Sequence, residues 1–330
     1  MKSEAIARER GTRADAVQRL LAFGALLIIF VGFSLASPYF LTFSNIVGIL
    51  VSTAVNGLLA IGVTFIIISG GIDLSVGTVM TLSSVMSAVF INFWGLPIPL
   101  GALAAIFTGT FAGFLNGVMI SKLKLPPFIA TLGMLNIAKG LSLVITDLSP
   151  SYFPLDSGWK EIAMGSILGS LIPGFEIPNA VLIMFGCALL AGLILSKTII
   201  GRYCFAIGSN EEAARLSGIN IDFWKTAIYA LGGFFVGITG VVIAARLNSA
   251  QPALGQGYEL DAIAAAVIGG VSLNGGEGTM LGTIIGAFII STLTNGLRIM
   301  SVPQEWQIVV TGLIVILAVY LDILRRGERS

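Results

Sequence analysis

The chain alternates between long apolar segments and short polar ones over most of its length. A helix that crosses about 30 Å of hydrocarbon needs roughly 20 mainly apolar residues. By this criterion we predict about ten membrane-spanning helices. The predicted spans are Leu20–Ala36, Val51–Ser69, Ser75–Ile91, Leu100–Ile120, Pro126–Ile145, Pro178–Leu195, Ala227–Ala245, Ala262–Leu273, Gly278–Leu297 and Trp306–Tyr320. The eighth is short and interrupted by glycine, which favours a half-helix or re-entrant segment, and Phe43–Leu50 before the second is a possible further broken piece.

Composition supports a protein that lies almost wholly in the bilayer. Of its 330 residues, 56% are hydrophobic and only 11% are charged, whereas soluble domains carry about 25% charged residues. We therefore predict an all-α membrane protein with one transmembrane domain, residues 20–323, between tails formed by residues 1–19 and 324–330. The basic N-terminus and first apolar run resemble a secretory signal, but further apolar segments follow, so an uncleaved helix is the better interpretation.

The distribution of charge sets the predicted orientation. Most of the 18 Lys and Arg residues fall on one side when the spans are threaded through a bilayer, and this side includes both tails and the loop of residues 196–224. Because cytoplasmic loops carry an excess of basic residues, we predict that both termini are cytoplasmic and that the number of spans is even. The loop of residues 146–179 is then periplasmic.

Glycines recur every fourth residue in the fourth and ninth predicted spans. At this spacing they share one face of a helix, and such faces let membrane helices approach closely. Close helix packing is one interpretation, and the lining of a moving interface is the other. The residues are Gly109, Gly113 and Gly117 in the fourth span, and Gly278, Gly282 and Gly286 in the ninth.

A weak echo between two glycine-rich stretches indicates a possible internal repeat. Ser69-Gly70-Gly71, followed by Gly77-Thr78, resembles Ile268-Gly269-Gly270, followed by Gly278-Thr279. Transporters often contain internal repeats whose broken helices meet at the substrate path.

The sequence lacks the motifs of common catalytic sites. There is no phosphate-binding loop of the type G-x-x-x-x-G-K-[ST], so we expect no ATP hydrolysis by this chain. Histidine is absent, and Cys187 and Cys204 are predicted to be unpaired. We therefore predict no catalytic residue, no metal site and no cofactor.

A few polar residues lie in or beside the predicted spans. Asp73 could cap the next helix near Ser75, or it could take part in gating or substrate passage. Lys139 lies within the fifth span, where a buried partner or snorkelling is expected. Three span asparagines could line a path or form hydrogen bonds between helices: Asn56, Asn116 and Asn136.

The loop of residues 196–224 contains a predicted short helix. Ser209 or Asn210 can cap it, acidic residues favour its first turn, and Gly218 ends it. It is either a solvated connector or a docking element for a cytoplasmic partner. The candidate docking residues are Gly208, Asn210, Glu211, Glu212, Ala214, Arg215 and Gly218.

Three long motifs resemble those of ribose-type permeases of ABC importers. They are Gly70–Gly77, Gly201–Ile219 and Ala245–Gly270, and the resemblance extends from about Leu41 to the C-terminus. It implies a permease with about ten spans in the bacterial inner membrane. The substrate would be ribose, or alternatively another pentose, a hexose, a polyol or a sugar-like signal. A secondary carrier working alone, or a membrane enzyme or scaffold, is the competing hypothesis.

The resemblance also implies partners and a mechanism. A separate ATPase subunit would dock on the loop around Gly208–Gly218, a periplasmic sugar-binding protein on the outer face, and a second copy or a homologous permease beside this chain in the lipid bilayer. No nucleic acid partner is expected. Sugar would pass between the two permeases by alternating access. The outer segment would supply a docking rim or an outer gate through Arg246, Glu259 and Asp261.

Overall fold

The computed structural model describes residues 20–172 and 174–327, and this part of the chain is mainly helical. The predicted tail of residues 1–19 lies outside the described residues. The helices are Leu20–Ala36, α2 (Phe43–Ile68), α3 (Val76–Ala88), α4 (Ile98–Ser121), α5 (Pro127–Ile145), α6 (Glu161–Met164), α7 (Ile167–Leu171), α8 (Asn179–Lys197), α9 (Ile199–Ser209), α10 (Glu211–Leu216), α11 (Ile221–Leu247), α12 (Tyr258–Ile268), α13 (Met280–Ile299) and α14 (Gln304–Gly327). A π-helix, η1 (Val89–Phe93), continues α3.

Within the described residues, 7 helices are long and apolar enough to cross a membrane: α2, α3 with η1, α4, α5, α8, α11 and α13. The prediction of a multi-pass helical membrane protein is therefore confirmed. Three predicted spans correspond to shorter elements: Leu20–Ala36, the 11-residue α12, and the apolar part of α14, Gln304–Leu317. The short eighth element agrees with the half-helix alternative. Helix α14 continues to Gly327, so the predicted C-terminal tail begins inside a helix.

One expectation about α2 is wrong. The segment Phe43–Leu50 is not a separate broken piece, because α2 runs without interruption from Phe43 to Ile68. At 26 residues the helix is longer than a perpendicular span needs, so it can extend beyond the hydrocarbon or tilt within it.

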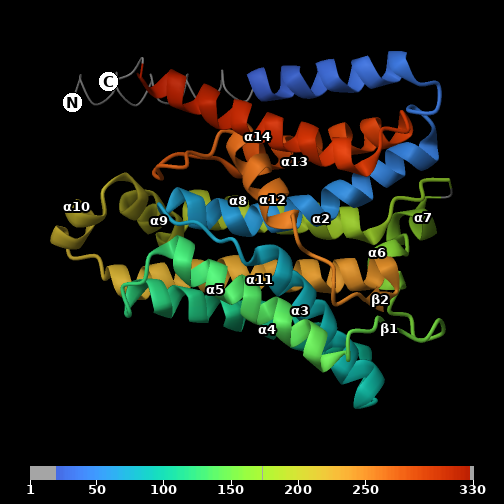
Figure 1. Cartoon of the computed structure of the whole chain (residues 1–330), viewed down its shortest axis with the longest axis horizontal. Helices are drawn as coiled ribbons and strands as arrows, with labels where there is room; N and C mark the ends of the chain where they lie inside the picture. The colour runs from blue at the N-terminus through green and yellow to red at the C-terminus, as the bar shows by residue number, and fades with distance from the viewer. Residues whose placement is uncertain (1–19, 173, 328–330) are drawn as a thin grey trace.

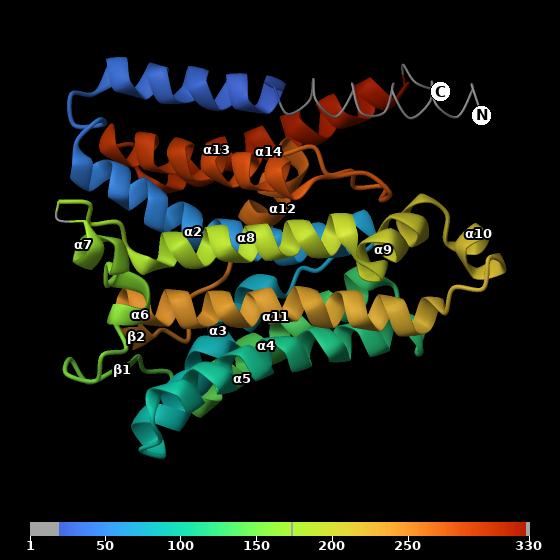
Figure 2. The ribbon, with the colours of Figure 1, turned by 180° about the vertical axis from the view of Figure 1, so that it is seen from behind.

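Most helices lie roughly along the long axis of the molecule (Figure 1). Helices α9 and α10 lie at one end, which we call the α10 end. Helices α6 and α7 lie at the other, the β1 end, with two short strands, β1 (Ser151–Tyr152) and β2 (Ser249–Ala250). The strands pair antiparallel, with Ser151 opposite Ala250. Seen from behind, α8 and α11 both run between the two ends (Figure 2), and each packs against α2.

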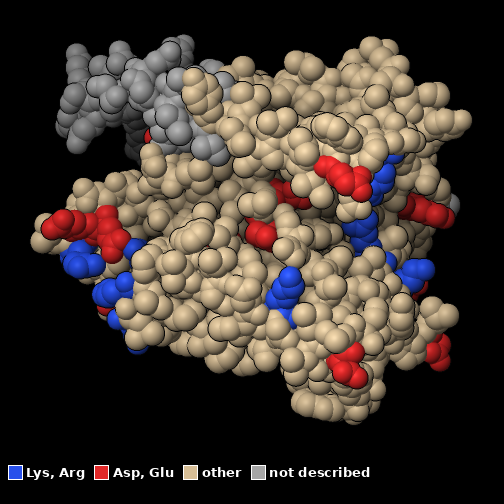
Figure 3. Space-filling view, in the orientation of Figure 1, with Lys and Arg blue, Asp and Glu red and all other residues tan. Residues whose placement is uncertain are grey.

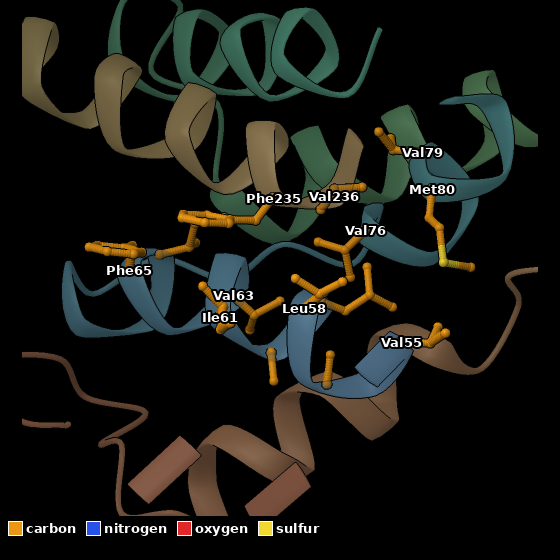
Figure 4. Close-up of a cluster of buried hydrophobic side chains, with 14 of the residues drawn as sticks. Val55, Leu58, Ile61, Val63, Phe65, Val76, Val79, Met80, Phe235 and Val236 are labelled. Carbon is orange, nitrogen blue, oxygen red and sulfur yellow. The ribbon is translucent and has the colours of Figure 1, made fainter. Parts of the chain in front are cut away.

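Helix α2 is the centre of the bundle, in contact with α8, α11, α12 and α13. Its apolar side chains meet those of α3 and α11 in a cluster that includes Phe65, Val76 and Phe235 (Figure 4). The rings of Phe65 and Phe235 are stacked with centroids 6.1 Å apart. Lipid is as apolar as these side chains, so close packing rather than expulsion from water holds them together.

The three glycines of α4 all face α11. A methyl group on Gly109 would lie 2.5 Å from the carbonyl oxygen of Gly233, and one on Gly117 would lie 2.6 Å from Cα of Thr226. A methyl group on Gly113 would overlap the carbonyl oxygen of Tyr229. The two backbones therefore approach too closely for any side chain between them.

The expectation for the second glycine set needs a correction. Gly282 and Gly286 lie in α13 and pack against the backbone of α12 at Gly269 and Ala265. Gly278 lies two residues before α13, with φ 154°, so it does not share their helical face. The four-residue spacing suggested one continuous helix, but the helix begins only at Met280.

Candidate functional site

Two helices end in the same kind of glycine turn. After α2, Gly70 takes φ 77°, its N–H donates to the Ile67 carbonyl (2.9 Å), and the next N–H, that of Gly71, donates to the Ile66 carbonyl (2.9 Å). This is the Schellman pattern of a helix C-terminus.

After α12 the pattern recurs. Gly270 takes φ 97° and donates to Val267 (2.9 Å), and Val271 donates to Ala266 (2.9 Å). The weak echo in the sequence therefore corresponds to one local structure formed twice. It extends no further, because Gly77 lies inside α3 whereas Gly278 precedes α13.

Helices α3 and α12 both begin inside the bundle, and the first turns of α3 touch the residues that lead into α12. The backbones of Gly77 and Gly255 are in such close contact that neither could carry a side chain. The Thr81 hydroxyl donates to the Leu254 carbonyl (2.8 Å). Following α3 and η1 from Gly77 to the β1 end, Asn92 donates to Ser151 Oγ (2.9 Å). Fifteen residues of helix separate Gly77 from Asn92, so the two helix starts meet about 22 Å from that end.

This geometry corrects the view of Arg246–Asp261 as one outer segment. Arg246 lies in the last turn of α11, near the β1 end, and contacts Ser52 Oγ (3.4 Å). The chain then runs inward, so Glu259 and Asp261 lie in the first turn of α12, deep in the bundle. Glu259 is only 8% exposed, and both its carboxylate oxygens accept the Gly257 N–H (3.1 Å each). The Glu259 carboxylate therefore accepts the backbone N–H of the residue that caps α12.

A second buried acidic residue, Asp73, lies three residues before α3. Its side chain is buried, and Oδ1 accepts from the backbone N–H and the hydroxyl of Ser75 (2.8 and 2.6 Å). Asn116 Nδ2 of α4 donates to Asp73 Oδ2 (3.3 Å) and to Ser75 Oγ (3.0 Å). The Asp73 carboxyl group therefore holds the N-cap residue of α3, Ser75, through its backbone and its side chain.

The four candidate path residues do not form one site. Asp73 and Asn116 are in contact and buried. Asn56 Nδ2 donates to Ser291 Oγ (3.2 Å) between α2 and α13, away from that pair. Asn136 is exposed on α5 and donates to the Leu132 carbonyl of its own helix (3.1 Å).

A polar contact that sequence reasoning missed joins α5 to the start of α12. Lys139 Nζ donates to Gln256 Oε1 (3.1 Å). Gln256 is exposed, and Lys139, Tyr258 and Asp261 are half-buried. We call these four residues together with Asn136 the polar seam. A lysine within an apolar span was a signal that a partner must exist, but nothing in the sequence identified Gln256.

The predicted short helix in the loop of residues 196–224 is present as α10. Asn210 caps it, with Oδ1 accepting the Ala213 N–H (2.9 Å), and Gly218 follows it with φ 86°. Glu211 forms ion pairs with Lys225 of α11 (2.5 Å) and Arg215 (3.2 Å). Leu216, not among the predicted docking residues, is 84% exposed. Charged side chains gather at this end (Figure 3).

Gly208 connects this region to the bundle. A methyl group there would overlap the Ile68 carbonyl oxygen and lie 2.6 Å from the Gly276 N–H nitrogen. That N–H itself donates to the Ile68 carbonyl (2.8 Å). The last turn of α9 is therefore packed tightly between the end of α2 and the loop that holds Gly276, between α12 and α13.

Comparison with known proteins identifies the family. The sequence profile of the family described as "Branched-chain amino acid transport system / permease component" matches residues 45–319. The chain is 41% identical to the ribose import permease protein RbsC of Bacillus subtilis, over 98% of each chain. It is 40% identical to RbsC of Escherichia coli K12, over 90% of this chain and 91% of that one.

A second group of relatives is named for another pentose. The chain is 35% identical to the xylose transport system permease protein XylH of Haemophilus influenzae, over 90% of this chain and 94% of that one. No solved structure matches. The chain therefore belongs to this family of transport-system permeases, and within it to the ribose-type permeases of ABC importers that its motifs had indicated.

Proposed function

We propose that this chain is the membrane-spanning subunit of an ATP-driven importer for ribose or a similar small sugar. The observation that carries the proposal is the similarity to ribose import permeases over nearly the whole chain. The xylose relatives make another pentose the alternative substrate. The setting would be a bacterial inner membrane, with both termini and the α10 end cytoplasmic, in agreement with the basic residues of the tails and of the 196–224 loop.

The proposed partners are an ATPase, a periplasmic sugar-binding protein and a second permease, either another copy or a homologue. Helix α10 supports the first of these. Its six residues lie at one end of the molecule, held by the Glu211–Lys225 ion pair, while Arg215 and Leu216 face outward. Arginine is enriched among the residues that dominate binding at protein interfaces, so an outward-facing Arg215 beside an exposed apolar side chain is well suited to a protein contact.

Alternating access would use the two helices that begin inside the bundle, α3 and α12. Helix α3 meets the residues just before α12 through the close contact of the Gly77 and Gly255 backbones and the bond of the Thr81 hydroxyl to the Leu254 carbonyl. Because backbone atoms form most of this contact, few side chains would have to repack if α3 and α12 moved relative to each other. The periplasmic protein would supply affinity for sugar, so the permease would need only transient polar contacts along its path.

The test is uptake of labelled ribose into liposomes that contain this chain and its ATPase, with ATP inside and binding protein outside. We expect uptake only when both are present, with xylose as the competing substrate. ATPase activity that the binding protein stimulates, without ribose uptake, would retain the importer and reject ribose. Uptake without ATP would reject the importer in favour of a secondary carrier.

The docking role of α10 gives a separate prediction. Leu216→Asp is expected to weaken association with the ATPase at least tenfold, because burying a carboxylate at the contact costs several kcal/mol. Leu155→Asp is the matched control, since Leu155 is 89% exposed but lies in the loop of residues 146–179. Equal co-purification of the ATPase with both variants would show that α10 is not the docking element.

A further inference from the structure

The polar seam lies at a depth where the bundle should meet hydrocarbon. Helix α5 runs from Pro127 to Ile145, so Lys139 is 12 residues from one end and 6 from the other. At 1.5 Å per residue, Lys139 lies about 18 Å from the Pro127 end of α5 and about 9 Å from the Ile145 end. Its partner Gln256 precedes α12, whose start lies about 22 Å from the β1 end. Basic and acidic atoms are visible between the two ends on the face in Figure 3.

Charged groups at this depth are not left facing lipid. Placing a lysine or aspartate in the middle of a membrane helix costs at least about 2.5 kcal/mol, and such residues face the bundle interior or a water-filled cavity. Lys139 could reach toward one end of α5, yet its ammonium group is instead bonded to the Gln256 amide. We therefore expect this face to be covered by protein or water rather than by lipid.

The seam differs from the buried polar groups nearby. Asp73, Asn116 and Glu259 are buried, and the two carboxylates are engaged with the first turns of α3 and α12. Of the seam residues, Asn136 and Gln256 are exposed, and Lys139, Tyr258 and Asp261 are half-buried. Asn136 lies three residues before Lys139, on a neighbouring part of the same helix face. The seam is thus a more accessible polar surface than the buried groups at the starts of α3 and α12.

We propose that the polar seam is the sugar-contacting wall of the translocation path, with Lys139 as its central donor. This rests on the proposed import function. The seam combines an ammonium donor, two amides that both donate and accept, a phenol and a carboxyl group. Sugar hydroxyls both donate and accept, so such a mixed lining can replace water around a sugar, as pore selectivity generally requires. The Lys139–Gln256 bond also bridges α5 to the start of α12, and a passing hydroxyl group can exchange with it.

The first test measures whether the seam is wet. In a chain whose Cys187 and Cys204 are replaced by Ala and Ser, single cysteines are introduced as Asn136→Cys and Gln256→Cys. A charged, membrane-impermeant methanethiosulfonate is expected to label both. Ile137→Cys and Leu141→Cys are the matched controls, because both residues are exposed on α5 (54% and 45%) but point away from Asn136 and Lys139. We expect at least about tenfold slower labelling there, since the reactive thiolate forms only in water. Equal labelling of all four sites, or none, would overturn the proposal.

The second test measures sugar passage. Lys139→Met, which keeps the length of the side chain without its charge, is expected to reduce ATP-driven ribose uptake about tenfold or more, since a hydrogen bond to a charged group is lost. Binding-protein-stimulated ATPase activity should stay within about twofold of the unmodified protein. Lys160→Met, in the exposed loop before α6, is the control and should transport normally.

The two tests distinguish a failure of the seam proposal from a failure of the proposed import function. Normal uptake by Lys139→Met would remove the seam from the path, and so would a loss of ATPase activity equal to the loss of uptake. If the unmodified protein takes up no sugar, the import function fails, while the labelling pattern still decides whether the seam is a water-lined surface.

Discussion

Replacing Gly208 by alanine is expected to reduce sugar uptake at least about tenfold and to lower the thermal midpoint of the purified protein. The added methyl group would overlap the Ile68 carbonyl oxygen and press on the Gly276 N–H, which are hydrogen-bonded to each other. Both neighbours are backbone atoms, so no side chain can rotate to make room. Overpacking of this kind typically costs 1–3 kcal/mol, and the end of α9 must shift away from the end of α2 and from the loop that holds Gly276.

Gly186→Ala on α8 is the matched control, because a methyl group there meets no atom within 4 Å. It should behave as the unmodified protein in proteoliposome uptake and in thermal unfolding. Normal uptake by Gly208→Ala would show that the tight contact of α9 with the end of α2 and with the Gly276 loop is not needed for transport.

A methyl group on Gly113 is expected to destabilise the protein by about 2–3 kcal/mol, with the opposite sign from the same change on α5. At Gly113 the methyl group would overlap the Tyr229 carbonyl oxygen and lie 3.0 Å from Cα of Gly233, which forces α4 and α11 apart. At Gly133 on α5 nothing lies within 4 Å. There the change should be neutral or stabilising by up to about 1 kcal/mol, because alanine favours a helix over glycine.

Thermal unfolding of the two variants in the same detergent measures this difference directly. The midpoint should fall for Gly113→Ala and stay level or rise for Gly133→Ala. A shared shift in one direction would mean that the α4–α11 contact is not the tight interface that the geometry describes.

The bilayer makes the long helices predictable and leaves their breaks to tertiary structure. Apolar length located α2, α4, α5, α8, α11 and α13, because the thickness of the hydrocarbon sets the length of any span. The cap at Asn210 was also predictable, since it depends on the residues beside it.

The depth of Glu259 was not predictable from local sequence. It depends on how the backbones of Gly77 and Gly255 meet, and these residues are far apart in the chain. The partner of the α4 glycines could have been found, because Gly233 and Gly237 repeat the four-residue spacing on α11. The prediction for Gly278 was wrong because its four-residue spacing from Gly282 extends across the start of α13.

The shortness of α12 has a consequence for how the protein is made. Its 11 residues extend about 16 Å, roughly half the hydrocarbon thickness, so the segment cannot be inserted as a span in its own right when it leaves the ribosome. Its place is defined by contacts with α2 and α3, synthesised long before it, and with α13, synthesised after it. The helices made before α12 are therefore in the membrane without one of their packing partners, and the bundle is completed only near the end of synthesis.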